Sequence, residues 1–219
     1  MKIKRIEGNS YTLRLNRTFY NAKNQYSIKE GFLVELITDS VIGYGEASPL
    51  KGFSKETMQE IRWIFQAFIE AIDQNIEYTF EEILILAKVH CSQIPSLHFA
   101  IDTAIYDIVS KKNKIPLSKL LNSKCSNEVK LSSIYIHNMP IKTYASNYMK
   151  YKLGVKNINE DMKILDLIKG CNQSIKFRFD CNRYYTVEKF SSTYQILEHL
   201  DINYFEEPIK NPTTKKLYK

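Results

Sequence analysis

The sequence has few of the residues that build flexible linkers, covalent cross-links or membrane spans. It contains 7 Gly and 6 Pro among 219 residues, so long flexible linkers are not expected. The 4 cysteines form no Cys-x-x-Cys pair, and no histidine stands at ligand spacing from them, which argues against a zinc site and a disulfide framework. No run approaches the roughly 18 apolar residues of a membrane span, and the basic stretch 1–16 lacks the apolar core of a secretory signal. These absences predict a soluble, cytoplasmic protein with no membrane partner.

The excess of basic residues raises the question of a nucleic-acid partner, since the net charge is +7 and the pI is about 9.0. The lysines are scattered through every segment rather than gathered on one stripe, and the densest groups are Lys111–Lys112 and Lys215–Lys216. Because lysine is exposed in most folds, a solvated surface explains this pattern better than a binding stripe. We expect no specific nucleic-acid partner.

The first half of the chain predicts a small antiparallel sheet followed by helices. Turns are expected at Gly8–Asn9 and Asp39–Ser40. Apolar residues then recur at helical spacing, and Ser54 and Thr79 stand where helix N-caps are expected. The strands are expected over residues 3–15, 31–38 and 41–46, and the helices over residues 57–73, 79–89, 95–108 and 116–121.

From about residue 126 the pattern changes to alternating strands and helices, which is typical of parallel βαβ units. The strands are expected over residues 131–136, 150–153, 175–179 and 202–205, and the helices over residues 141–148, 159–169 and 186–200. The polar stretch 123–128 separates the two patterns. The sequence therefore predicts an α+β domain over residues 1–125, followed over residues 126–219 by about the first four strands of a (β/α) barrel of the TIM type.

Three short motifs end successive predicted strands of the second half: Lys150-Tyr151-Lys152, Asp180-Cys181-Asn182-Arg183 and Glu206-Glu207-Pro208. The intervals are 28 residues from Lys152 to Asp180 and 26 from Asp180 to Glu206, close to the roughly 31 residues per unit of a (β/α)8 barrel. Functional groups of such barrels gather where the strands end, so two ammonium groups and two carboxylates would meet at one rim. This set suits a base beside a hard divalent cation such as Mg²⁺.

Each motif taken alone has an ordinary structural interpretation. The two lysines fit a surface strand, Asp180 fits the start of a turn, and acids with a proline commonly end strands. The matched order and spacing of the three motifs favour a shared site instead. Inside a closed barrel, partial burial and a neighbouring cation would lower a lysine pKa, as a general base near neutral pH requires.

Five segments resemble the enolase superfamily in its muconate-lactonizing branch, and look most like the o-succinylbenzoate synthases. Residues 43–54 resemble that family's G-W-G-E-x-x-P-L-P-G-F-S segment, with Tyr for Trp and Lys for Pro, and residues 100–107 resemble its capping-domain helix. Residues 150–152 are similar to its K-x-K motif, residues 180–183 to D-A-N-R and residues 205–208 to the E-E-P motif. The match covers nearly the whole chain, and Arg183 leans toward the synthases over the dipeptide epimerases.

The resemblance implies roles for these residues. Lys152 would remove the proton next to the substrate carboxylate, and Lys150 would sit behind it and bias its charge. Asp180 and Glu206 would be two of three ligands to Mg²⁺, an arrangement of lysine and Mg²⁺ that is general in this superfamily. The remaining implied roles are support of the metal ligands by Asn182 and Glu207, and contact with the substrate by Gly52, Phe53 and Ser54.

The resemblance also implies a reaction: Mg²⁺-dependent dehydration of 2-succinyl-6-hydroxy-2,4-cyclohexadiene-1-carboxylate to 2-succinylbenzoate in menaquinone biosynthesis, with a small-molecule carboxylate as the ligand. A dipeptide epimerase or cycloisomerase is the alternative within the superfamily.

The family's third acidic ligand and second catalytic lysine would fall beyond Lys219. We therefore expect a truncated barrel that is inactive alone and is completed by a C-terminal barrel half or by a homo-oligomer; a non-catalytic fragment that needs a partner chain is the alternative of another class.

Overall fold

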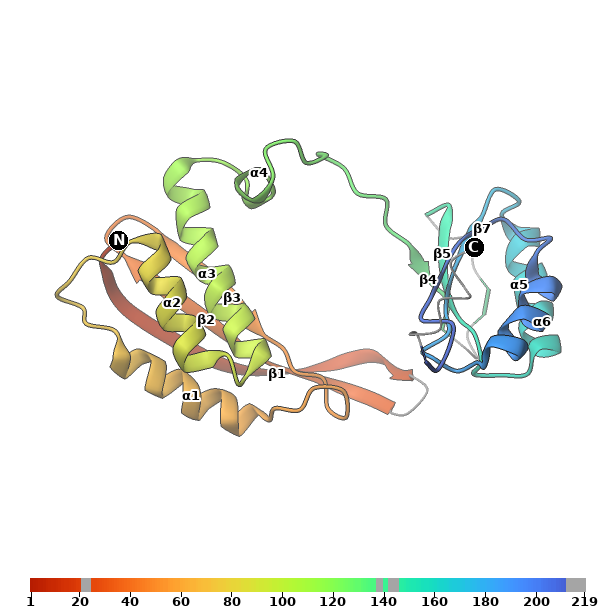
Figure 1. The fold of residues 1–219 in the computed structure, drawn as a ribbon, viewed down its shortest axis with the longest axis horizontal. Coiled ribbons are helices and arrows are strands. Elements are labelled where there is room, and N and C mark those ends of the chain that lie inside the picture. The colour runs from red at the N-terminus through yellow and green to blue at the C-terminus, as the bar shows by residue number, and fades with distance from the viewer. Residues whose placement is uncertain (21–24, 137–139, 142–145, 212–219) are drawn as a thin grey trace. The chain divides into compact units, whose positions relative to one another are not determined.

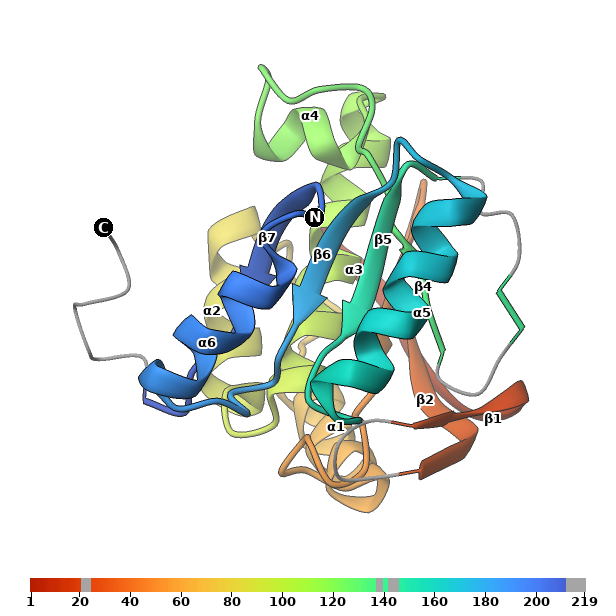
Figure 2. The same ribbon diagram turned by 90° about the vertical axis from the view of Figure 1, so that its right-hand side faces the viewer.

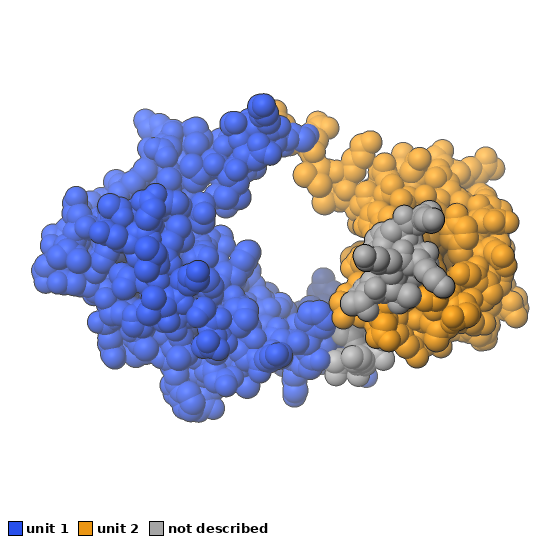
Figure 3. Space-filling model, in the orientation of Figure 1, with its two compact units in different colours: residues 1–126 blue, residues 127–219 orange. Residues whose placement is uncertain are grey.

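The computed structural model describes residues 1–20, 25–136, 140–141 and 146–211. The chain divides into two compact units, unit 1 over Met1–Ser126 and unit 2 over Asn127–Lys219 (Figure 3). Each unit has its own hydrophobic core. Within the described part of the chain, none of the helices is both long enough and apolar enough to cross a membrane.

Unit 1 begins with an antiparallel sheet in the order β1-β2-β3 (Figure 1). Its strands are β1 (Ile3–Tyr20), β2 (Gln25–Thr38) and β3 (Ile42–Ala47). The sheet expected from the sequence is confirmed, but β1 and β2 are longer than predicted. The tight turn between β2 and β3 is closed by Thr38, whose hydroxyl and backbone N–H both donate to the carbonyl of Val41.

The turn expected at Gly8–Asn9 is wrong, because β1 runs straight through these residues and Gly8 pairs with Val34 on β2. Gly8 is placed there by packing rather than by a turn. A Cβ atom at Gly8 would lie 2.3 Å from the ring of Phe32 and 2.4 Å from the ring of Phe65. The absent side chain makes room for these two rings, which meet edge to face with their centroids 4.9 Å apart.

The helices of unit 1 are α1 (Met58–Ala71), α2 (Phe80–Cys91), α3 (Pro95–Asn113) and α4 (Leu117–Leu121). Three of the four, α1, α2 and α3, pack against one face of this sheet, and α4 follows α3 away from it (Figure 1). All four helices expected from apolar periodicity are present. The core that they enclose is built from fully buried residues of the sheet and of three helices, including Val34, Leu36, Ile61, Phe68, Ile83, Leu97 and Ile101.

Helix α1 is capped by Thr57, so the expected cap at Ser54 is wrong. The Thr57 hydroxyl accepts a hydrogen bond from the Glu60 N–H at 3.2 Å, and the Glu60 carboxylate accepts one from the Thr57 N–H at 2.7 Å. This reciprocal pair is a capping box, which satisfies two backbone donors at once. The hydroxyl of Ser54 instead accepts from the Leu50 N–H at 2.9 Å and closes the turn before the helix.

Strand β3 and helix α3 approach each other so closely that only glycine fits between them. A Cβ atom at Gly43 would lie 2.1 Å from the carbonyl oxygen of Ala104, and one at Gly45 would lie 1.8 Å from that of Ala100. The glycines of the 43–46 segment therefore serve packing, since a β-carbon at either position would require the helix to move.

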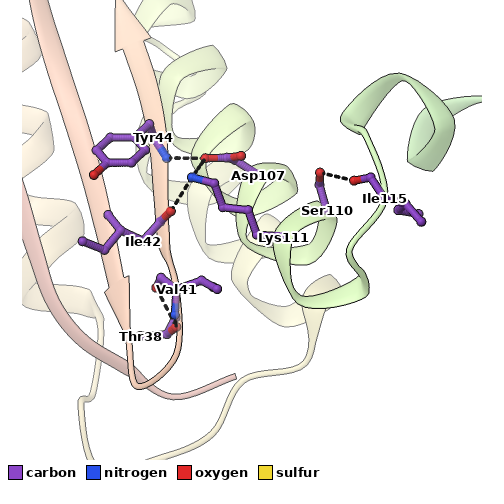
Figure 4. Close-up of polar contacts among 8 residues, drawn as sticks. All are labelled: Thr38, Val41, Ile42, Tyr44, Asp107, Ser110, Lys111 and Ile115. Carbon is purple, nitrogen blue, oxygen red and sulfur yellow. Dashed lines mark hydrogen bonds and ion pairs between the residues drawn. The ribbon is translucent and has the colours of Figure 1, made fainter.

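Polar contacts lock the same pair of elements in register (Figure 4). The backbone N–H of Tyr44 donates to Asp107 Oδ2 at 2.9 Å. Lys111 donates from its ammonium group to the same carboxylate oxygen and to the carbonyl oxygen of Ile42, each at 2.7 Å. The segment 43–46 and the helix segment 100–107, which both carry the family resemblance, are thus joined to each other in unit 1.

Unit 2 contains a parallel sheet in the order β4-β5-β6-β7 (Figure 2). Its elements are β4 (Ser133–Ile134), β5 (Tyr148–Lys152), α5 (Ile158–Cys171), β6 (Lys176–Asp180), α6 (Val187–Leu197) and β7 (Ile202–Glu206). The alternation of strand and helix confirms the expected βαβ units. The strand expected over residues 131–136 is reduced to β4. Half of the helix expected over residues 141–148 falls outside the described residues, and its last residue, Tyr148, opens β5 instead.

The two faces of the parallel sheet differ in character. On β5, Met149 and Tyr151 are buried in the core with residues of α5 and α6, whereas Tyr148, Lys150 and Lys152 lie on the opposite, partly exposed face. The same alternation continues on β6 as far as Phe179, and Asp180 at the end of that strand is also buried. The charged side chains therefore share the face that a barrel would turn inward, and the Arg178 guanidinium lies there over the rings of Tyr148 and Tyr204. Tyr151, Phe177 and Phe179 belong instead to the core that includes residues of α5 and α6.

Candidate active site

Parallel pairing brings the ends of three strands of unit 2 into line. Lys152 pairs with Asp180 across β5 and β6, and Asp180 pairs with Glu206 across β6 and β7. Each of these residues is the last of its strand. An amine and two carboxylates that are 28 and 26 residues apart in sequence are therefore neighbours at the C-terminal edge of one sheet.

Lys150 links the two carboxylates directly. Its Nζ atom lies 2.6 Å from Glu206 Oε2 and 3.4 Å from Asp180 Oδ2. Asp180 is almost fully buried, with a relative exposure of 4%, while the side chain of Glu206 is 42% exposed. One ammonium group thus occupies the space between the acids. The sequence had assigned Lys150 a place behind Lys152, and this direct contact with both carboxylates was not expected.

The carboxylates also determine the charge state of Lys150. Partial burial would lower its pKa, but the hydrogen bond to Glu206 and the negative charges of Asp180 and Glu206 outweigh burial and raise the pKa above its usual value. The side chain is therefore a firmly charged ammonium. The expectation that burial and a neighbouring cation lower the lysine pKa does not hold for Lys150.

The loop after β6 folds back on the site. Asn182 donates its backbone N–H to Asp180 Oδ1 at 3.2 Å, so it contacts the carboxylate through its main chain. The carboxylate of Glu207, the residue that follows β7, accepts a hydrogen bond from Arg183 Nε at 2.9 Å. The backbone N–H of Arg183 donates to the backbone carbonyl of Glu207 at 2.7 Å. The carboxylate of Glu207 is therefore engaged by Arg183.

Backbone strain is concentrated at this edge of the sheet. Asn182, Arg183 and Glu207 have φ angles of 44°, 58° and 44°, in the left-handed region that residues other than glycine rarely adopt. Such conformations cost energy and persist where the surrounding contacts impose them, which is common beside functional sites. Here the contacts that impose them are the hydrogen bonds between the loops that follow β6 and β7.

Sequence reasoning missed a buried acid beneath the same strand. Asp161 on α5 is fully buried, and its Oδ1 atom accepts a hydrogen bond from the Tyr151 hydroxyl at 2.7 Å. Burial raises the pKa of Asp161 to about 6, although the hydrogen bond from Tyr151 and the Gly154 N–H act in the opposite direction. A signal was present in the sequence, because Asp161 lies on the same helical face as the buried Leu165 and Ile168.

The expected substrate loop, Gly52, Phe53 and Ser54, belongs to unit 1. Gly52 has a φ of 77°, and the Phe53 side chain is 83% exposed. The N–H groups of Phe53 and Ser54 both donate to the carbonyl of Leu50. The loop is thus a tight turn that presents an aromatic ring to its surroundings, and its contact with a substrate stays a prediction.

The donor set fits a hard cation in part. The carboxylate oxygens of Asp180 and Glu206 lie close enough together for the Lys150 ammonium group to contact both. Mg²⁺ is commonly bound through one or two carboxylates, with water and substrate oxygens completing its coordination shell. The described residues contain no group of three or more His, Cys, Asp or Glu side chains arranged to hold a metal ion. Two carboxylates are therefore the hard oxygen donors that lie together at this edge of the sheet.

Comparison with known sequences identifies relatives of several kinds, among them epimerases, a racemase, a dehydratase and o-succinylbenzoate synthases. Residues 3–108 match the family model described as the MenC N-terminal domain. A hydrophobic dipeptide epimerase of Enterococcus faecalis is 23% identical over an alignment covering 96% of this chain and 62% of the relative. An o-succinylbenzoate synthase of Vibrio cholerae is 24% identical over 84% of this chain and 52% of the relative. The chain therefore spans 62% or less of the length of these curated relatives.

Solved structures of similar fold also include epimerases and a protein of the mandelate racemase and muconate lactonizing type. A dipeptide epimerase from Enterococcus faecalis V583, complexed with Mg and the dipeptide L-Leu-L-Tyr, has a TM-score of 0.81 and 26% identity over 96% of this chain and 62% of that chain. A mandelate racemase/muconate lactonizing protein from Herpetosiphon aurantiacus has a TM-score of 0.79 at 18% identity, over 95% of this chain and 61% of that chain.

The chain has the fold of the enolase-superfamily enzymes, with an α+β N-terminal domain followed by a parallel α/β sheet that corresponds to part of a barrel. This confirms the fold class expected from the sequence. Its relatives are enzymes of that superfamily, and they include epimerases as well as synthases at similar identity. The preference for the synthases that Arg183 suggested stays a prediction.

Proposed function

We propose that the chain carries the first part of an enolase-superfamily active site that removes a proton next to the carboxylate of a small-molecule substrate. The observation that carries this proposal is the register of the parallel strands, in which Lys152, Asp180 and Glu206 are neighbours at one sheet edge. An amine for proton transfer beside two hard oxygen donors is the combination that this chemistry needs.

In the proposed mechanism, Asp180 and Glu206 would hold Mg²⁺, and a dipeptide epimerase structure to which the chain is similar is complexed with Mg. When bound, Mg²⁺ supplies positive charge that offsets the negative charge developing on the substrate carboxylate. Lys152 takes the proton from the adjacent carbon at its Nζ atom. Asn182 would keep Asp180 in position through its backbone hydrogen bond, and Glu207 would hold the neighbouring loop through Arg183.

The reaction that we favour is the dehydration of 2-succinyl-6-hydroxy-2,4-cyclohexadiene-1-carboxylate to 2-succinylbenzoate, a step of menaquinone biosynthesis. The match of residues 3–108 to the MenC N-terminal domain supports it. In this reaction Lys152 would return its proton to the departing hydroxide, so that one residue serves as base and then as acid. This candidate is a lyase, whereas the second candidate, an epimerase, is an isomerase.

A dipeptide epimerase is the second candidate. Epimerases align with 96% of the chain by sequence and by structure, against 84% for the synthase. The two reactions share the removal of a proton next to a carboxylate and differ in the step that follows, because an epimerase returns a proton to carbon. The substrate loop at residues 52–54 and the residues around it would determine which carboxylate is accepted.

We also propose that turnover needs polypeptide in addition to this chain, either a C-terminal barrel half or a second copy. Relatives with assigned activity are longer, since the chain aligns with 62% of one and 52% of another. Among the described residues, β4 and β7 each have a strand neighbour on one side only. A partner that pairs with these edges would satisfy their free backbone groups. A non-catalytic role as a fragment of such an assembly is the alternative.

Exchange of the substrate proton with deuterated water tests the shared step directly. The purified chain with Mg²⁺, alone and mixed with a polypeptide supplying the rest of the relatives' barrel, is offered the cyclohexadiene carboxylate and a set of dipeptides. We expect exchange only in the mixture, and Lys152→Ala to lower its rate by about 10²-fold or more because the base is gone, with Mg²⁺ binding kept.

Lys176→Ala is the matched control for that experiment. Lys176 opens β6 at the other end of the sheet and pairs with Asp201 at 3.4 Å, so its removal deletes an equal charge away from the site. Exchange at the normal rate is expected in this variant. Normal exchange in Lys152→Ala would eliminate the proposed base, and exchange by the chain alone would contradict the need for a partner.

A further inference from the structure

The position of Lys150 has a consequence for any cation that binds to Asp180 and Glu206. Its ammonium group lies within ion-pair distance of both acids, at 3.4 Å and 2.6 Å. Two neighbouring carboxylates, one of them almost fully buried, repel each other strongly unless a positive charge stands between them. In this structure Lys150 supplies that charge.

The oxygen atoms involved leave little freedom for a second cation. Asp180 Oδ1 accepts a hydrogen bond from the Asn182 N–H, so Oδ2 is the oxygen that faces Lys150. A magnesium ion contacts its ligand oxygens at about 2.0–2.1 Å. An ion at that distance from Asp180 Oδ2 and Glu206 Oε2 would occupy the space of the Lys150 ammonium group, and the two positive charges would also repel each other.

We propose that Lys150 is an internal counter-ion that competes with the divalent cation for Asp180 and Glu206. The cation binds only as the ammonium group leaves, and in its absence Lys150 keeps the carboxylates close together and the sheet edge folded. Lysine is suited to this exchange because its charge sits at the end of a flexible four-carbon chain, which can swing away without moving the strand. This inference rests on the proposed metal site and adds to it a residue that sets the affinity.

Calorimetric titration with Mg²⁺ and thermal unfolding without metal test the competition. Lys150→Met keeps an unbranched side chain that is one atom shorter and removes its charge. We expect Mg²⁺ to bind this variant at least about tenfold more tightly than the unmodified chain, which corresponds to about 1.4 kcal/mol. Without metal the variant should melt at a lower temperature, because the carboxylates lose their counter-ion, and saturating Mg²⁺ should remove most of that deficit.

Two variants separate direct competition from a general effect of charge. Lys150→Arg keeps the positive charge and should bind Mg²⁺ as weakly as the unmodified chain. Lys152→Met removes an equal charge two residues away on the same strand face and should raise the affinity much less than Lys150→Met does. Equal gains at positions 150 and 152 would contradict competition at the carboxylates, as would unchanged or weaker Mg²⁺ binding by Lys150→Met.

Asp180→Asn distinguishes failure of this inference from failure of the metal site itself. If Asp180→Asn weakens Mg²⁺ binding while Lys150→Met leaves it unchanged, the site stands and the competition is refuted. If Asp180→Asn has no effect, or if no variant binds Mg²⁺, the proposed metal site is refuted as well. Lys150→Gln repeats the test with a shorter neutral side chain in case Lys150→Met does not fold, and far-ultraviolet circular dichroism checks folding of each variant.

Discussion

The buried pair of Tyr151 and Asp161 is the clearest case in which a single residue controls stability. Asp161 has no exposed surface, and its Oδ2 atom is buried without a hydrogen-bond partner in the described structure. A carboxylate in such a place is costly when charged. The pair anchors strand β5 to helix α5 directly beneath the two lysines of the K-x-K motif.

We predict that Asp161 makes unit 2 less stable as the pH rises. Its folded pKa of about 6 lies above the ordinary value of 3.8, so its favourable contribution is complete below pH 3.8 and is lost as the pH rises to about 6. The loss should be on the order of 3 kcal/mol. Urea unfolding at several pH values measures it as the difference between the unmodified chain and Asp161→Asn.

The difference between the two proteins matters, because other carboxylates also titrate in this range. Asp161→Asn should gain stability relative to the unmodified chain between pH 4 and pH 7, since its amide stays neutral. Tyr151→Phe should lose about 1–3 kcal/mol at neutral pH, because the buried carboxylate loses its hydrogen-bond donor. A pH profile that Asp161→Asn leaves unchanged would show that the acid is not buried as described.

At the residue scale, side-chain contacts were the least predictable part of the site. Lys150 on β5 carries a flexible chain that reaches across β6 to Glu206 on β7, and no local pattern encodes that direction. Gly8 looked like a turn residue because its environment, two aromatic rings from distant segments, is invisible in the local sequence. The sequence allowed the position of each residue on its strand to be predicted. The residue that each side chain contacts depends on tertiary structure and could not be predicted.

At the scale of elements, hydrophobic periodicity predicted nearly every helix and strand, because each buries one face. Errors arose where tertiary contacts override a local signal. Ser54 and Thr57 are both good helix caps, and the reciprocal bond with Glu60 decides for Thr57. The strand expected over residues 131–136 is reduced to Ser133–Ile134, and within the described part of the chain it pairs with β5 alone.

The contact between β3 and α3 yields a prediction at this scale. Gly45→Ala should destabilise unit 1 by about 2 kcal/mol or more, because its new methyl group would meet the Ala100 carbonyl at 1.8 Å and push strand and helix apart. Chemical unfolding followed by circular dichroism provides the measurement. The glycines of segment 43–46 would then be required for packing whether or not the protein is active.

Gly170→Ala is the control for this substitution. Gly170 lies in α5, and a Cβ atom there would meet nothing within 4 Å. The change should stabilise unit 2 by about 0.5–1 kcal/mol, because alanine favours the helix more than glycine does. Equal effects at positions 45 and 170 would contradict the close approach of α3 to β3.

At the scale of the whole molecule, the chain consists of two units whose cores are separate. The core of unit 1 is formed by residues 3–108 and that of unit 2 by residues 135–209. The alternation of element types revealed this division in the sequence, since an antiparallel sheet with helices is followed by βαβ units. The number of strands that finally surround the site could not be read in the same way, because pairing partners of β4 and β7 need not be near them in sequence.

Separate cores predict that unit 1 folds without unit 2. Residues 1–126 produced alone should unfold cooperatively in urea, because all the buried residues of their core are present. Ile101→Ala, at a fully buried position of α3, should cost about 2–5 kcal/mol in this piece and the same amount in the full chain. A clearly smaller cost in the isolated piece would mean that unit 1 depends on unit 2 for its packing.

The alignment of Lys152, Asp180 and Glu206 also has a kinetic consequence. The outer members of this trio are 54 residues apart, and each is delivered by a different strand. Contacts between such distant segments form late, because closing the intervening chain costs entropy before any gain is made. A cation that binds both Asp180 and Glu206 could therefore not speed early folding. It would instead slow unfolding, because β7 could separate from β6 only after the cation had dissociated.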